Sequence, residues 1–338
     1  MTDHDDVRDL LAAWVFGALE PAEERAVPRH FAACESCAAE AARLRETVRL
    51  LDGPPPVPDP VGSNGTGAPD AVLSRALRSR PAPPRVAAHA TPYAAAVTGL
   101  RALLREAEGR WTTPVVHDWD VHATVAHLLA ADEHLAVRLG VEARVPASAI
   151  AEGTDWGAAW DRRTADVIAH EYGRTPEETL AAWSAQADDL LATPHARDAE
   201  LAAGTTLSMG VRLPVTDHFL ARGFEAWIHT DDIGRALGIA VPPPPAPQLW
   251  QLVRLAVRIL GASLGTGAPP VLFAVDGGEE WVLGSQDDPV RAELTLDPVD
   301  FCLLVGGRYA PEEVPRRATG DEEAVANVLE TAARLSWL

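Results

Sequence analysis

Apolar residues recur at helical spacing in several stretches of the chain, which are separated by segments rich in proline and glycine. The first stretch covers residues 4–51, where Leu10 and Trp14 belong to a stripe with the three-to-four-residue period of a helix surface. Pro21 suits the first turn of a second helix, and a third helix is expected over residues 34–51. The pattern therefore predicts a small all-α module at the N-terminus.

Two breaks follow this module. Residues 52–70 (DGPPPVPDPVGSNGTGAPD) carry almost no large apolar side chain, which is the composition of a linker. A short amphipathic piece follows at residues 71–80, before a second segment rich in proline. We therefore expect one module over residues 1–80, with a linker inside residues 52–69, and a second linker over residues 81–92.

Helical periodicity returns beyond the second break and then gives way to shorter patterns. Five helices are expected, over residues 93–107, 122–140, 156–170, 176–193 and 214–238. They predict a helical bundle over residues 93–240, which the proline tract at residues 241–247 ends. Past that tract, apolar runs broken by Gly and Asp predict a small α+β domain over residues 248–338. Its expected helices cover residues 250–264 and 322–338, and its expected strands cover 270–277, 279–285 and 291–298.

Charge and composition argue against several classes of protein. The chain has 338 residues, 49 acidic side chains against 29 basic ones, and a net charge of −20. Binding to nucleic acid or to an anionic membrane surface needs a surplus of basic side chains, so neither partner is expected. The acidic N-terminal sequence MTDHDD is unlike a signal peptide, and no apolar run is long enough to span a membrane. We therefore expect a cytoplasmic protein.

Metal-binding residue types lie close together near the start of the chain. His30, Cys34 and Cys37 form the pattern H-x3-C-x2-C, whose spacings put three donors on one side of a helix start. A structural zinc ion takes four nitrogen or sulfur donors, so one more is required. His4 is the only earlier His or Cys in the chain. The possible substitutes are three carboxylates, on Asp3, Asp5 and Asp6.

This N-terminal pattern resembles the zinc-binding anti-sigma family. The family's leading His is matched by His4, and its next stretch by GALEPAEERAVPRHFAACESC. The segment APDAVLSRALRSR is similar to the family's last helix, so that the resemblance covers about residues 1–80. It implies a structural zinc ion held by His4, His30, Cys34 and Cys37, and an alternative sigma factor as the partner.

Zinc could also do no more than hold this module together, because about 50 residues bury only a marginal core. Many members of the family release the sigma factor through a thiol switch. Here the first ligand is His, and a disulfide between Cys34 and Cys37 would join consecutive turns without pinning the first helix, which argues against such a switch. Cys302 lies in the apolar run FCLLV and is expected to be an inert core residue.

A second group of candidate ligands lies in the bundle. Glu225 and His229 are four residues apart, so both side chains leave the same face of a helix, together with Arg222 and Asp232. His127 stands on an otherwise apolar helix. Three protein ligands are the usual count for a catalytic zinc ion that keeps one position open. Asp232 could orient the imidazole of His229 from outside the ligand set.

Spacing alone is weak support for this site, because a single His on a helix is more often a core or surface residue. Four nearby histidines compete with His127 and are expected to be exposed. They are His117, His122, His134 and His218.

The wider pattern resembles the mycothiol-dependent maleylpyruvate isomerase family. It consists of W-x7-H, from Trp119 to His127, followed by R-x2-E-x3-H-x2-D-x3-A-x-G, from Arg222 to Gly238. The resemblance covers about residues 88–338 and implies a DinB-like four-helix bundle with one divalent metal, usually zinc, and a sterol-carrier-like α+β C-terminal domain. It further implies His127, Glu225 and His229 as ligands, a low-molecular-weight thiol such as mycothiol held as thiolate, and an Arg222 that could hold an anionic group of the thiol or substrate.

These observations leave two main hypotheses for the whole multidomain chain. In the first, it is an anti-sigma-like transcription regulator whose bundle senses a thiol or small ligand through its metal. In the second, it is a mycothiol-dependent isomerase or thiol transferase with an accessory zinc module. A binding protein without turnover is a third option. We favour the regulator, because the N-terminal module resembles a family with a specific protein partner and no substrate signature is visible.

Overall fold

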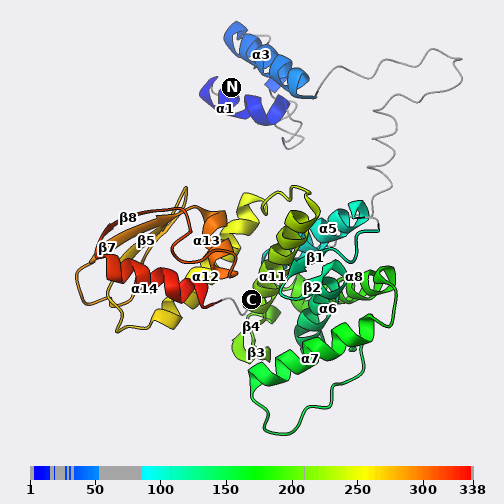
Figure 1. Cartoon of the computed structure of the whole chain (residues 1–338). Helices are drawn as coiled ribbons and strands as arrows, with labels where there is room; N and C mark the ends of the chain where they lie inside the picture. Colours follow the sequence, from blue (N-terminus) through cyan, green and yellow to red (C-terminus); the bar gives the residue numbers. More distant parts are fainter. Residues whose placement is uncertain are drawn as a thin grey trace, which may run out of the picture. The chain divides into compact units, whose positions relative to one another are not determined.

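The structure is a computed structural model that divides into two compact units, residues 1–81 and 82–338. It describes residues 4–15, 19, 27–28, 30–31, 34–52, 85–107, 109–208 and 210–335. The linker expected over residues 52–69, apart from its first residue, and the amphipathic piece at 71–80 lie outside these ranges. Each unit is described by itself, and Figure 1 labels the elements.

The N-terminal unit is helical, as the apolar period predicts. Helix α1 covers His4–Val15 and α3 covers Glu35–Asp52. Residues 27–28 and 30–31 are also helical, whereas most of the helix expected from Pro21 lies outside the described residues. A small core joins α1 to α3 and contains Val7, Leu11, Val27, Cys37 and Ala41. So small a core stabilises the unit only weakly.

The second unit begins with a helical bundle. Its long helices are α5 (Thr91–Glu106), α6 (Val121–Arg138), α7 (Trp156–Glu171), α8 (Pro176–Ala192) and α11 (Val215–Leu237). All five helices expected from the sequence are therefore confirmed, with ends within two residues of those expected. The short elements between them are η1 (Ala88–Ala90), α9 (Pro194–Arg197), α10 (Ala199–Ala202) and two antiparallel hairpins, β1 (Pro114–Val116) with β2 (Trp119–Asp120) and β3 (Thr205–Ser208) with β4 (Val211–Pro214).

The C-terminal region combines a sheet with three helices (Figure 1). The helices are α12 (Ala246–Leu264), α13 (Pro298–Val305) and α14 (Glu322–Ala333). The strands are β5 (Val271–Val275), β6 (Glu280–Leu283), β7 (Ala292–Leu296) and β8 (Arg316–Gly320), in the spatial order β6-β5-β7-β8. Only β5 and β7 are parallel. The expected mixture of helices and strands is confirmed, whereas the sterol-carrier-like fold stays a prediction.

Helix α11 joins the bundle to this region. One of its faces contributes Phe219 and Ile233 to the core of the bundle, and another contributes Phe224 and Ile228 to the core around α12 and the sheet. A Cβ at Gly223 would lie 2.8 Å from the backbone nitrogen of Tyr93, so this glycine lets α11 pack closely on α5. The two cores thus share one helix, which lies before the boundary predicted at residues 241–247.

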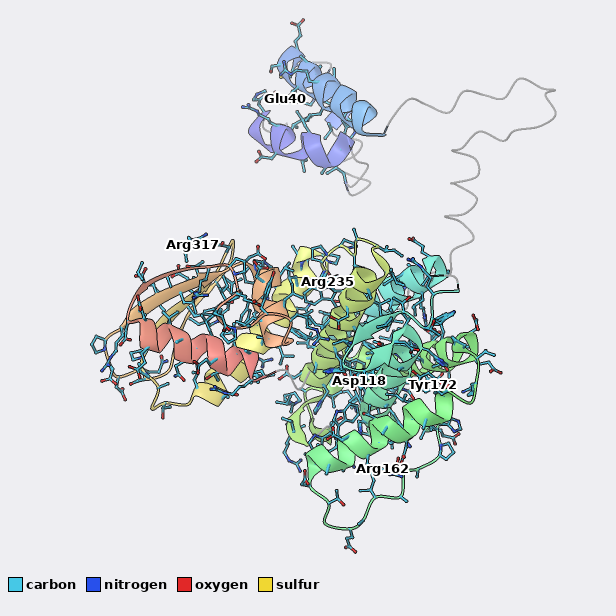
Figure 2. All side chains as sticks on the ribbon, viewed as in Figure 1. Glu40, Asp118, Arg162, Tyr172, Arg235 and Arg317 are labelled. Carbon is cyan, nitrogen blue, oxygen red and sulfur yellow. The ribbon has the colours of Figure 1, made fainter. Side chains whose placement is uncertain are left out.

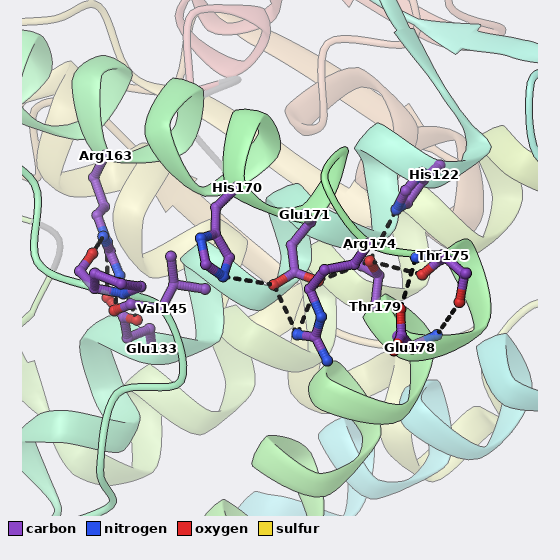
Figure 3. A network of polar contacts seen from close by, with 11 residues as sticks. His122, Glu133, Val145, Arg163, His170, Glu171, Arg174, Thr175, Glu178 and Thr179 are labelled. Atoms are coloured by element: carbon purple, nitrogen blue, oxygen red, sulfur yellow. Dashed lines mark hydrogen bonds and ion pairs between the residues drawn. The ribbon is translucent and has the colours of Figure 1, made fainter.

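A buried polar network fixes α6, α7 and α8 to one another (Figure 3). The carboxylate of Glu171 accepts hydrogen bonds from Thr179, at 2.7 Å, and from Arg174, at 3.1 Å. His122 continues this network, with its Nε2 2.8 Å from the hydroxyl of Thr179. Two turns earlier on α7, Arg163 forms two hydrogen bonds with the carboxylate of Glu133. These contacts hold the helices that carry part of the candidate site.

Figure 2 shows the side chains of the described residues in the same view. No helix within the described ranges is long and apolar enough to cross a lipid bilayer.

Candidate metal centres

The first candidate centre lies in the N-terminal unit. His4 begins α1, Cys37 lies in the first turn of α3, and Cys34 directly precedes that helix. The Nδ1 atom of His4 is 3.3 Å from Sγ of Cys34 and 3.5 Å from Sγ of Cys37. With His30, they offer four ligand atoms that all lie within 4.8 Å of one another. The structure thus brings together the four residues that the resemblance implies.

The two thiols of this cluster differ in acidity. The Ser36 hydroxyl, 3.1 Å from Sγ of Cys34, and the backbone at Cys37 lower the pKa of the Cys34 thiol to about 6. Burial and the neighbouring Cys34 raise the pKa of Cys37. The thiolate is the form that binds metal, so Cys34 is ready for this role at neutral pH. By contrast, burial raises the pKa of Cys302 far above its usual range, which agrees with an inert core residue.

The second candidate centre lies inside the bundle. His127 comes from the middle of α6, a helix that begins where the carboxylate of Asp120 accepts a hydrogen bond from the Ala123 backbone at 2.8 Å. Glu225 and His229 come from α11, one helical turn apart. All three side chains are buried, and their ligand atoms lie within 4.8 Å of one another. Nε2 of His127 is 2.9 Å from Oε1 of Glu225.

Charged neighbours hold Glu225 in its ionised form. Nη1 of Arg222 lies 2.6 Å from Oε2 of Glu225, and the two side chains are only 3% and 2% exposed. Burial alone would raise the pKa of Glu225, but the Arg222 guanidinium and the imidazole of His127 hold it well below its usual range. Arg222 therefore supplies the positive charge that this buried carboxylate requires.

His229 is held in place by a chain of contacts that starts at Arg308 in the C-terminal region and passes through Asp232. Nδ1 of His229 is 3.1 Å from Oδ2 of Asp232. Both carboxylate oxygens of Asp232 also accept hydrogen bonds from Arg308, with Nε at 3.0 Å from Oδ1. Burial would raise the pKa of Asp232, but His229 and Arg308 lower it to about 2. A carboxylate in this position can orient the imidazole, and its role behind a set of metal ligands stays a prediction.

The donor chemistry of both clusters fits zinc. Two imidazoles with two thiols make up a common structural zinc site, and two imidazoles with one carboxylate make up a common open one. The buried Nε2 of His30 and the buried Nδ1 of His127 have no hydrogen-bond partner among the described residues. The role of these seven residues as metal ligands is taken up below as a proposal.

A cavity of about 590 Å³ lies against the second cluster. Besides the cluster and Asp232, its lining includes Val116, His117, Trp119, Trp160, Asp161, Gly306, Gly307 and Arg308. Trp119 packs against His127 with ring centroids 4.5 Å apart, and Trp160 does so at 5.6 Å. Sequence patterns did not single out Trp160, Asp161 or Arg308 as site residues, because they belong to other elements than the ligands. For Arg308, the only available signal is the Gly-Gly-Arg that follows an apolar run.

Arg222 does not line this cavity, and its guanidinium is committed to Glu225. The expectation that it holds an anionic group of a ligand therefore finds no support in its placement. Arg308 is the guanidinium that reaches the cavity.

The four competing histidines lie outside both clusters. His117 is exposed, as expected, but also lines the cavity. The expected exposure is wrong for His122 and His218, which are 6% and 5% exposed, because each packs into the bundle and contacts an oxygen, of Thr179 and of the Thr206 backbone respectively. It is also wrong for His134, which is half-buried beneath Trp156 and Trp160.

Two parts of the chain match models of known protein families. Residues 5–38 match a zinc-finger family model, which begins one residue after His4. Residues 90–234 match the model of the mycothiol maleylpyruvate isomerase N-terminal domain, which includes all three residues of the second cluster. Two separate parts of the chain are thus similar to two different families, a zinc finger and the mycothiol maleylpyruvate isomerase N-terminal domain.

Two solved structures also match part of the chain, at TM-scores below 0.5. One is the crystal structure of the mycothiol-dependent maleylpyruvate isomerase, with a TM-score of 0.49 and 14% identity. The other is a mutant of that enzyme, with a TM-score of 0.48 and 13% identity. Each comparison covers 69% of this chain and 92% of the other. No curated protein matches the sequence.

Proposed function

We propose that this chain is a cytoplasmic regulator that binds an alternative sigma factor through its N-terminal unit and responds to a low-molecular-weight thiol at the second cluster. The observation that carries the proposal is the presence of two different donor sets on one chain. One set has four donors, two of them thiols, and the other has three donors beside a cavity.

In the N-terminal unit, His4, His30, Cys34 and Cys37 would hold a structural zinc ion. Four protein donors fill a tetrahedral zinc site and leave no position for a substrate. The ion would tie the start of α1 to the start of α3, because His4 and Cys37 lie there. It would thereby fix the helical surface that the sigma factor contacts.

In the bundle, His127, Glu225 and His229 would hold a divalent metal, most simply zinc. Such an ion supplies a positive charge at an open position, which favours the thiolate form of a bound thiol. The residues of the chain prepare this site: Arg222 balances Glu225, and Asp232 orients His229. Trp119 and Trp160 place aromatic surface beside His127.

The sigma-factor part of the proposal is tested by co-purification from the native host. The full tagged chain is expected to retain one alternative sigma factor, identified by mass spectrometry. Cys34→Ala should lose this partner, whereas Cys302→Ala, which removes the thiol outside the cluster, should keep it. Recovery without any sigma factor, or equal recovery by both variants, would contradict the proposal.

The second candidate function is that of a mycothiol-dependent isomerase or thiol transferase. The cavity of about 590 Å³ favours it, because a regulator that only bound a sigma factor would not need one beside its metal ligands. This function requires turnover of maleylpyruvate, or of a model electrophile, that depends on added mycothiol and is lost in Glu225→Gln. Thiol binding without turnover would contradict this enzyme function and would agree with the sensing role.

A further inference from the structure

The cavity beside the second cluster contains an imidazole that neither the cluster nor the fold uses. His117 lies in the turn between β1 and β2 and lines this cavity with His127 and His229. It does not belong to the cluster of metal-binding atoms. Figure 2 labels Asp118, its neighbour in the same turn.

The backbone at His117 is strained. Its φ angle is 54°, and it is the one residue other than glycine with a positive φ within the described ranges. A side chain in this left-handed conformation costs about 1–2 kcal/mol, which glycine would avoid. The chain thus carries an imidazole at a position where a smaller residue would be more stable. Such strain often accompanies function.

Packing places the imidazole of His117 at the wall of the cavity. It contacts Trp119 edge to face, with ring centroids 5.0 Å apart and planes at 70°. Trp119 in turn packs on His127, so one indole ring separates His117 from a candidate ligand. No hydrogen bond among the described residues involves either ring nitrogen of His117. Both nitrogens are therefore available to a molecule in the cavity.

The charges around His117 favour its neutral form. Partial burial makes the largest contribution to lowering the pKa of His117. The positive charge of Arg308 and the imidazole of His127 lower this pKa further. Asp232 on α11 and Asp118 in its own turn oppose this effect. Asp161 on α7 also lines the cavity. At pH 7 the imidazole is therefore neutral and can accept a proton. It keeps that proton when a negative charge is added beside it, and a thiolate bound in the cavity would supply this charge together with Asp232 and Asp118, so that the pKa of His117 rises on binding.

We propose that His117 accepts the proton of the thiol that binds in this cavity, an inference that rests on the proposed thiol site. The S–H bond breaks, its electron pair stays on sulfur as thiolate, and the proton forms an N–H bond with the free ring nitrogen of His117. Charge is conserved, because one neutral thiol and one neutral imidazole become a thiolate and an imidazolium. No proton leaves the protein for the solvent.

This conservation of protons gives a direct test that does not require turnover. Mycothiol is titrated into the metal-loaded full chain at pH 7, by calorimetry in buffers with different ionisation enthalpies, which yields the number of protons released. The wild-type protein is expected to release close to none, since His117 keeps the proton. His117→Asn should release about one proton per thiol bound, because a free thiol with a pKa of about 8.5 is mostly protonated at pH 7.

The variants are chosen so that folding does not obscure the result. Asn and Gly both tolerate a positive φ, so His117→Asn and His117→Gly are expected to fold and to keep the wild-type metal content. In both variants the affinity for mycothiol should rise about tenfold per pH unit below the thiol pKa, whereas wild-type affinity changes little. His170→Asn, which replaces an exposed histidine outside the cavity, is the matched control and should behave like the wild-type protein.

The outcomes separate this inference from the function on which it rests. Equal proton release by the wild-type protein and His117→Asn would overturn the role of His117 and leave the thiol site standing. A metal-loaded wild-type chain that does not bind mycothiol would overturn the thiol site itself, and the role of His117 with it.

Discussion

The two donor clusters of this chain are supported in opposite ways. The N-terminal cluster belongs to a unit with a small hydrophobic core, and His4 is exposed. The cluster in the bundle is fully buried between two long helices, and a guanidinium and a carboxylate already satisfy its charges. We therefore expect the first cluster to depend on a bound ion for its structure, and the second to belong to a scaffold that forms without one.

The two clusters also differ in what a metal ion bound at each of them could do. Four donors enclose an ion and leave it a structural task, but three donors beside a cavity leave room for a ligand. The predictions below test whether the two clusters differ in these ways, beginning with the largest expected effect.

Removing metal should unfold the N-terminal unit and spare the bundle. Structural zinc contributes about 10–16 kcal/mol of apparent binding free energy, far more than so small a core can replace. After chelation of the full chain, amide hydrogens in α3 should exchange freely while those in α11 stay protected. Cys37→Ser should have the same effect, and Cys302→Ala should not. An α3 that remained protected without metal would show that the core alone suffices.

Glu225→Gln should destabilise the bundle by about 3–5 kcal/mol, because it leaves the buried Arg222 without its counter-charge. Denaturant unfolding of the bundle measures this loss, and elemental analysis should find one metal ion fewer per chain. Asp231→Asn is the control on the same helix. Its partner Arg235 is half-exposed, so the loss should stay below about 1 kcal/mol. Equal losses would mean that burial does not distinguish the two pairs.

Two buried groups away from the clusters should give the bundle opposing pH dependences. Burial lowers the pKa of His134 to about 4, so lowering the pH from 7 to 5 protonates the unfolded chain first and destabilises the fold. Burial raises the pKa of Asp132 to about 7, although Arg222 and the Tyr93 hydroxyl oppose this. The folded carboxyl keeps its proton where the unfolded one has lost it, so raising the pH from 5 to 7 destabilises the fold.

Each of these effects amounts to about 2 kcal/mol between pH 5 and pH 7, and the two oppose each other. In Asp132→Asn, the change in the free energy of unfolding from pH 5 to pH 7 should therefore be more positive than in the wild-type protein. In His134→Gln it should be less positive than in the wild-type protein. Denaturant unfolding of the three proteins at both pH values measures this change, and two variants that shift it in the same direction would refute the assignment.

Asp232→Asn should weaken metal binding in the bundle about 10–100-fold, because the imidazole of His229 loses the carboxylate that orients it. Competition with a chromogenic chelator measures the change. The matched variant in the other cluster is Ser36→Ala, which removes the hydroxyl 3.1 Å from Sγ of Cys34. Its effect should be smaller, since the neutral hydroxyl holds its ligand less strongly. A larger effect from Ser36→Ala would reverse the comparison.

Much of the fold could be predicted from the sequence, because long amphipathic helices and alternating strands carry a clear period. The expected strands at β5, β6 and β7 were found for this reason. Strand β8 was missed, since all of its residues are exposed and no apolar alternation marks it. The hairpins β1–β2 and β3–β4 are too short to show a period, although the first carries both His117 and Trp119.

The sequence by itself determined which donors stand on one helix. Glu225 and His229 are placed by the 3.6-residue turn, which is a local property of the chain. Cys37 lies in the first turn of α3 and Cys34 directly precedes that helix, so their closeness is also local. Only the tertiary structure decided what meets them. His127 reaches Glu225 across 98 residues, and Arg308 reaches Asp232 across 76, because the packing of α6, α11 and the C-terminal region sets those distances. No local period encodes such contacts, and the cavity that they enclose is a product of the fold.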